Sequence, residues 1–266
     1  EKDQLISKLT QLTAHIFTPN RLIVSITCEE EGYRIFTEEL RKLQKDLSDI
    51  GNTDHVLDLP VKDRRYRLFS GSPVRKNEGL TISSSVQYVA RSGRYLEHPE
   101  EYHGSIKVFL TIMRFEYLWF HIRVQGGAYG CMSSASPDGT CAFVSYRDPN
   151  LRRTNEIYNG IPEFLEQFDV GEREMTKYVI GTMSALDKPL TPSQHSLRAI
   201  NAYFTGVREN ELQKQRDAII DATPQDIRAL SPLIRDTMAE GHLCVIGNEE
   251  KIEKNRALFD SVEPLF

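Results

Sequence analysis

Residues 123–130, with the sequence RVQGGAYG, decide the fold because a long apolar helix ends there and a strand begins. Upstream, residues 102–124 carry apolar side chains almost all round a helical period. We therefore expect this helix to be buried against a sheet on one side and against other helices on the other. Gly126 and Gly127 end the helix and let the chain reverse.

The segments outward from this stretch group strands before helices. Residues 128–135 and 140–146 flank the sequence SPDG, whose Pro-Asp-Gly order predicts a hairpin turn. Further strands are expected at residues 67–70, 80–90 and 242–246, and further helices at 151–168, 172–186, 192–204, 209–220, 224–240 and from 249. This order predicts an α+β fold in two layers, with a mainly antiparallel sheet packed against helices.

The first fifty residues form a separate pattern. A helix is expected at residues 4–16, a strand at 21–28 and a second helix at 30–50, followed by a polar connection. Such a piece is too small to bury a good core alone, so we interpret it as the tail of a preceding domain. The predicted division is residues 1–58 for this tail with its linker, and residues 59–266 for the main domain.

The composition limits the classes of function. Hydrophobic residues make up 39% and charged residues 27% of the 266 residues, which is typical of a globular protein with a real core. The net charge of −5 argues against a general nucleic-acid binder, although it leaves room for a local basic patch. No apolar run approaches the roughly 18 residues of a membrane span, so no membrane association is expected.

The cysteines and the first residues indicate the setting. The four cysteines (Cys28, Cys131, Cys141 and Cys244) are scattered without C-x-x-C pairs, which favours reduced thiols in an intracellular protein. No signal-peptide pattern is visible at the start. The chain opens on Glu1 inside a helical pattern, so a fragment or a processed product is expected.

A complete catalytic apparatus is not evident. His98 and His103 with Glu100 come nearest to a metal site, but two histidines five residues apart point about 140° apart around a helix. A helical zinc site needs them about one turn apart. We therefore expect no metal ligands here, and a polar connection into the helix instead.

Two further motifs are weak candidates. Cys131 and Cys141 lie on adjacent strands of the predicted hairpin, but no nearby residue supplies the base that a cysteine nucleophile needs. The glycines of the GGAYG sequence lack the lysine of a phosphate loop and follow a helix, not a strand. We therefore expect the two cysteines to be inert thiols and the glycines to form a structural turn.

Arg123 and Tyr129 are the remaining candidates. The first ends a helix and the second begins a strand, so two rigid elements bring a guanidinium and a phenol close together. Both groups are donors that can bind a peptide carbonyl or a developing oxyanion. On chemistry alone, a helix-capping arginine and an ordinary sheet tyrosine explain the same pattern more simply.

A resemblance gives this stretch more weight. The sequence RVQGGAYG, the hairpin, the sequence SYRDPN at residues 145–150, and the DKP sequence at residues 187–189 resemble the last domain of the presequence protease group. This group belongs to the pitrilysin/insulinase zinc metallopeptidases, with falcilysin and insulin-degrading enzyme. The resemblance covers about residues 66–266, and the helix–strand–helix before it is similar to the end of the third domain.

The resemblance implies an insulinase-type domain and a specific division of labour. These enzymes are clamshells of four homologous domains, in which an H-x-x-E-H motif in the first domain binds zinc and the last domain closes over peptide substrates. Arg123 and Tyr129 correspond to its substrate-contacting residues, with Gly126 and Gly127 as supporting scaffold. H-x-x-E-H is absent from this chain, so zinc and the catalytic residues are expected in an N-terminal half of the same polypeptide.

Three functions follow as alternatives. The first is the C-terminal part of a zinc endopeptidase for short unstructured peptides, located in a bacterial cytoplasm or an organelle matrix and inactive on its own. The second is a non-catalytic relative that keeps the fold as a scaffold. The third is an independent two-layer binding module. Retention of both Arg123 and Tyr129 favours the first, because a scaffold needs neither.

Overall fold

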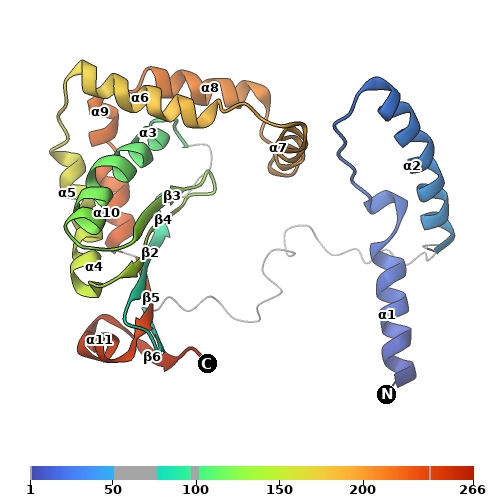
Figure 1. Ribbon diagram of the computed structural model, residues 1–266. Coiled ribbons are helices and arrows are strands. Elements are labelled where there is room, and N and C mark those ends of the chain that lie inside the picture. Colours follow the sequence, from blue (N-terminus) through green and yellow to red (C-terminus); the bar gives the residue numbers. More distant parts are fainter. Residues whose placement is uncertain (1, 51–76, 97–101, 240) are drawn as a thin grey trace. The chain divides into compact units, whose positions relative to one another are not determined.

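The computed structural model describes residues 2–50, 77–96, 102–239 and 241–266 (Figure 1). The chain separates into a first unit, residues 1–72 with 189–208, and a second unit, residues 73–188 with 209–266. The domain boundary predicted between residues 58 and 59 and the strand predicted at 67–70 lie outside the described residues.

The first unit is helical. It contains α1 (Lys2–Ile16), η1 (Pro19–Arg21), α2 (Glu30–Ile50) and α7 (Pro192–Thr205). The hydroxyls of Ser25 and Ser196 lie 3.0 Å apart and join the early segment to α7. Ala14 is the single buried hydrophobic residue among those described in this unit.

The strand predicted at residues 21–28 is wrong. This segment begins with the last residue of η1 and continues without regular structure to α2. Its residues Ile23, Val24 and Ile26 are exposed. A strand needs a neighbour to accept and donate its ladder hydrogen bonds, and no described segment pairs with this one.

The second unit is built on a six-stranded sheet with the order β3-β4-β2-β5-β1-β6 (Figure 1). The strands are β1 (Glu78–Ile82), β2 (Gln87–Arg94), β3 (Gly130–Ala135), β4 (Thr140–Asp148), β5 (His242–Asn248) and β6 (Ser261–Pro264). The pairs β3–β4, β4–β2 and β2–β5 are antiparallel, whereas β1 runs parallel to both β5 and β6. The α+β prediction is confirmed, and the sheet is mixed.

Two details of the sheet differ from the sequence pattern. The single strand predicted at residues 80–90 is two strands, β1 and β2, which are separated in the sheet by β5. Between them Val86 donates its backbone N–H to the Ser84 hydroxyl at 3.2 Å, so the serine-rich segment is a turn. β6 was not predicted, because its four residues contain Pro264 and show no alternation.

Helices cover one face of this sheet. α3 (Ser105–Ile112) continues through the π-helical segments η4 (Met113–Tyr117) and η5 (Trp119–Val124), confirming the long helix that precedes the glycine pair. The others are α4 (Leu151–Asn159), α5 (Ile161–Glu166), α6 (Glu172–Leu186), α8 (Glu209–Ile220), α9 (Pro224–Arg228), α10 (Ser231–Ala239) and α11 (Glu249–Lys254), with the 3-10 turn η6 (Arg256–Leu258). The helices predicted at 151–168 and 224–240 are therefore each split in two.

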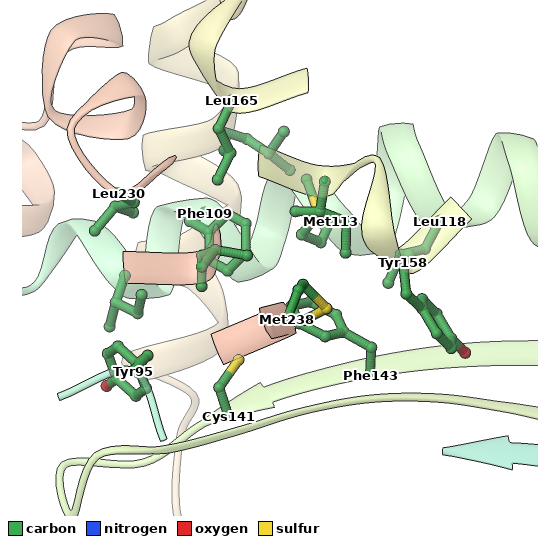
Figure 2. Packing of buried hydrophobic residues seen from close by; sticks show 14 of the residues in the cluster. Tyr95, Phe109, Met113, Leu118, Cys141, Phe143, Tyr158, Leu165, Leu230 and Met238 are labelled. Carbon is green, nitrogen blue, oxygen red and sulfur yellow. The ribbon is translucent and has the colours of Figure 1, made fainter. Parts of the chain in front are cut away.

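The core lies between the sheet and these helices. Phe109 of α3 meets Phe143 of β4 edge to face, with ring centroids 6.4 Å apart, and Phe143 meets Tyr158 of α4 at 6.0 Å. Figure 2 shows these three rings between the helices and the sheet. Because all three side chains are fully buried, they fix α3 and α4 on the sheet.

Replacing Phe143 by alanine tests this core. Phe143→Ala removes a fully buried ring, so we expect the free energy of unfolding to fall by about 3–5 kcal/mol in a urea titration. Phe115→Ala is the matched control, since that ring is 58% exposed, and should cost about 1 kcal/mol or less. Equal losses for the two variants would contradict the placement of the core.

Candidate functional site

The turn between the long helix and β3 is unusually tight. Gln125 donates its N–H to the carbonyl of Phe120 at 2.9 Å, Gly127 to that of Arg123 at 3.0 Å, and Ala128 to that of Ile122 at 3.1 Å. Gly127 has φ +77°, a left-handed conformation that other residues rarely adopt. This residue therefore turns the chain from the helix into β3.

Gly130 fixes how β3 begins. A Cβ atom on this residue would lie 2.2 Å from a ring carbon of Tyr146 on β4, which is far inside contact distance. The absence of a side chain lets the Tyr146 ring lie directly on the start of β3. That ring in turn meets the ring of Tyr129 edge to face, with centroids 5.3 Å apart.

Arg123 projects from the last turn of η5 and is exposed. Its guanidinium lies over the Trp119 ring, one helical turn earlier, at 4.1 Å from the ring centroid. Cation–π contact of this kind holds a flexible side chain in a preferred place. No ion pair occupies this guanidinium among the described residues.

Tyr129 lies at the other end of the turn, and its side chain is 60% exposed. Its backbone N–H donates to the carbonyl of Arg147 at 3.4 Å, and the Arg147 guanidinium lies 5.5 Å from the centre of its ring. Within the described part of the chain its hydroxyl makes no hydrogen bond, so the donor faces solvent. No direct bond joins Tyr129 to Arg123 among these residues.

A buried carboxylate anchors this arrangement. Asp148, at the end of β4, is fully buried. Its Oδ1 accepts the backbone N–H of Asn150 at 2.8 Å, and its Oδ2 accepts the Thr154 hydroxyl at 2.7 Å. Both donors belong to the start of α4, so the carboxylate fixes the end of β4 to the first turn of that helix.

The start of α4 is also bound to the glycine turn. The Asn150 side-chain amide donates to the carbonyl of Gly126, and the Arg153 guanidinium donates to the Gln125 carbonyl at 3.4 Å. Through these bonds the segment at residues 148–154 holds the turn that carries Arg123 and Tyr129. This gives SYRDPN a physical role as support for the turn.

Comparison with known proteins identifies the family of the chain. Residues 77–248 match the family described as "PreP C-terminal domain". The chain belongs to this family. It is 37% identical over 263 residues to "Protein HypA" of Clostridium perfringens, covering 99% of this chain and 26% of that protein. It is 31% identical over 179 residues to presequence protease 1, chloroplastic/mitochondrial, of Arabidopsis thaliana, covering 67% of this chain and 17% of that protein.

Solved structures show the same fold at low sequence identity. A peptidase M16 inactive domain from Pseudomonas fluorescens superposes with a TM-score of 0.52 at 11% identity, over 80% of this chain and 51% of that one. Pitrilysin superposes with a TM-score of 0.52 at 12% identity, over 79% of this chain and 23% of that one. The insulinase-type α+β domain predicted from the sequence is thereby confirmed, and the chain spans about a quarter or less of the curated relatives it matches.

The cysteines of β3 and β4 lack the properties of catalytic nucleophiles. Burial raises the pKa of the Cys141 thiol to about 12. Burial also raises that of Cys131, against the lowering effect of Arg123. Both thiols are therefore held protonated at neutral pH and are poor nucleophiles. Among the described residues, no group of three His, Cys, Asp or Glu side chains lies close enough together to hold a metal ion.

The histidine pair is only partly described. His98 and Glu100 lie outside the described residues. His103 precedes α3, is exposed, and its Nδ1 lies 2.9 Å from the Ser105 hydroxyl. This contact is local and needs no ligand to explain it. In the part of the chain that is described, no helix is long and apolar enough to cross a membrane.

The expectation that the long helix is buried all round is wrong for its second half. Phe115, Trp119, Phe120 and Val124 are 58%, 41%, 49% and 60% exposed. The inner side is packed, since Met113, Leu118 and Ile122 are fully buried. These exposed apolar side chains lie on the same half of the helix as Arg123, in a member of the presequence protease family.

Asp148→Asn tests the anchor. The substitution preserves the size of the side chain but replaces one of the two buried oxygens that accept hydrogen bonds by an amide nitrogen. We therefore expect the free energy of unfolding to fall by about 1–3 kcal/mol. Chemical denaturation of the variant measures this loss. Asp236→Asn, on the exposed side of α10, is the control and should change stability by less than about 0.5 kcal/mol. If the Asp148 variant is as stable as this control, the Asp148 hydrogen bonds do not stabilise the junction of β4 and α4.

Proposed function

We propose that this chain is the C-terminal part of a zinc endopeptidase that degrades short unstructured peptides. Arg123 and Tyr129 contact the peptide at the bond to be cleaved, and Gly126 and Gly127 support them. The observation that carries the proposal is the pair of exposed donors held at the two ends of one anchored turn, in a member of the presequence protease family.

The chemistry of the two side chains suits this role. A guanidinium and a phenol hydroxyl both donate hydrogen bonds, and neither has an internal acceptor among the described residues. Donors that are held in place before the substrate binds stabilise negative charge as it develops on a peptide carbonyl. Trp119 and Arg147 restrict the two side chains in this way by ring contacts.

The catalytic zinc is proposed to lie outside this chain. Zinc would supply an activated water for peptide hydrolysis when bound in an N-terminal half with an H-x-x-E-H motif. The present residues then bind and orient the peptide and close the chamber, and residues 1–58 complete a preceding homologous domain. The exposed apolar stripe of α1 (Leu5, Leu9 and Leu12) supports that last assignment, because it needs a partner to cover it.

The location is proposed as a bacterial cytoplasm or an organelle matrix. The relatives named above include one bacterial protein and one described as chloroplastic/mitochondrial. The cysteines support a reducing compartment, since the four described thiols are free. Reading the coding sequence upstream of Glu1 for an H-x-x-E-H motif tests the division of the enzyme into two halves.

Arg123→Ala and Tyr129→Phe test the proposed role of the two donors. Each variant of the complete peptidase should lose about 100- to 1000-fold in kcat on a quenched fluorescent peptide, because one donor to the transition state is removed. Zinc content and thermal stability should remain those of the wild type.

The controls are Arg198→Ala and Tyr203→Phe, which make the same changes at exposed positions of α7. They should leave kcat within about twofold. Wild-type cleavage by both the Arg123 and the Tyr129 variants would contradict the proposal and favour a non-catalytic scaffold.

A further inference from the structure

Arg147 has a backbone conformation that arginine rarely adopts. Its φ is +49°, and it is the one non-glycine residue with positive φ in the described ranges. Glycine reaches this region without steric cost, and asparagine does so more readily than arginine. Strain of this kind persists where the surrounding structure imposes it, and it is concentrated at functional sites.

A β-bulge imposes this conformation. Val89 pairs with Ser145, whereas Gln87, two residues earlier on β2, pairs with Asp148, three residues later on β4. The extra residue on β4 disrupts the ladder and redirects the side chains there. Asp148 and its bonds to α4 fix the far end of the bulge, so the Arg147 side chain is directed by the fold.

The redirected guanidinium lies beside the proposed substrate contact. It is 5.5 Å from the centre of the Tyr129 ring, and the residue is exposed. No ion pair with Arg147 occurs among the described residues. The adjacent Asp148 is buried, and its oxygens accept bonds from Asn150 and Thr154 and form no ion pair with the Arg147 guanidinium.

Three other cations lie close to the turn between the long helix and β3. Arg123 contacts Trp119, Arg153 donates to the Gln125 carbonyl, and Lys251 donates to the Pro149 carbonyl at 3.1 Å. None of these three has an acidic partner in the described part of the chain. In a chain whose net charge is −5, these cations form a local concentration of positive charge without an ion pair among the described residues.

We propose that Arg147 is a specificity-determining residue that binds a carboxylate of the peptide substrate beside Tyr129. A guanidinium is suited to this task because it can donate two parallel hydrogen bonds to one carboxylate. The carboxylate is that of an Asp or Glu side chain near the cleaved bond or that of a free C-terminus. This inference rests on the proposed function, since it assumes that peptides reach Tyr129.

The test uses the complete peptidase and one quenched fluorescent peptide that contains no acidic residue and ends in an amide. Single Gln→Glu changes near the cleaved bond, and separately a free C-terminal acid, introduce one carboxylate at a time. The wild type should prefer one carboxylate peptide over its neutral parent by about tenfold in kcat/KM. The series in which this preference occurs identifies the source of the carboxylate.

Two variants separate the guanidinium from the backbone. Arg147→Gly and Arg147→Ala both remove the guanidinium, but only glycine relieves the positive φ, so the glycine variant should melt about 2–4 °C above the alanine variant. Both should nevertheless lose the carboxylate preference, so that each variant cleaves the carboxylate and the neutral peptide with kcat/KM values within about twofold of each other. Arg147→Glu should reverse the preference.

The inference is overturned if the wild type shows no carboxylate preference at any position, or if Arg147→Gly retains it. It would also be overturned if the carboxylate preference were lost in the less stable Arg147→Ala variant but kept in the more stable Arg147→Gly variant, since both lack the guanidinium. Arg123→Ala provides the separate check on the proposed function. If that variant cleaves all peptides at the wild-type rate, the proposed role of the Arg123–Tyr129 turn fails, whatever the Arg147 variants show.

Discussion

The site depends on the hydrogen bonds that the buried Asp148 carboxylate accepts from the start of α4. A charge in an apolar interior is costly unless hydrogen bonds satisfy it, and here Asn150 and Thr154 do so from the start of α4. The end of β4 and the first turn of α4 therefore cannot move apart without exposing an unpaired charge. Because Asn150 also binds the Gly126 carbonyl, the same constraint reaches the turn between the long helix and β3.

From this constraint the exposed surface follows. The anchored turn presents Arg123 at one end and Tyr129 at the other, and the bulge before Asp148 adds Arg147 beside Tyr129. The long helix contributes exposed apolar side chains on the approach to Arg123. The result is a cationic surface whose turn is fixed by the Asp148 and Asn150 bonds and whose side chains are held by the ring contacts of Arg123 with Trp119 and of Arg147 with Tyr129.

Much of this was predictable from local sequence. SPDG and the glycine pair specify a hairpin and a chain reversal through turn chemistry, and the resemblance selected Arg123 and Tyr129 as candidates. The strand predicted at residues 21–28 failed because pairing depends on a partner segment that periodicity does not reveal. The conformation of Arg147 is not predictable from local sequence for a similar reason, since the bulge arises from pairing with Gln87, sixty residues earlier. The apolar pattern of the long helix likewise predicts burial on all sides, but it does not show whether this chain supplies the residues that would cover each side.

A crystal structure of the complete peptidase, with an uncleaved peptide bound in its closed state, tests whether the Asp148-anchored turn presents Arg123 and Tyr129 to the substrate. We expect a peptide carbonyl within about 2.7–3.2 Å of both the Tyr129 hydroxyl and the Arg123 guanidinium, with the Asp148 bonds intact. A bound peptide that lies elsewhere, with these two side chains turned into contacts with other parts of the protein, would contradict it.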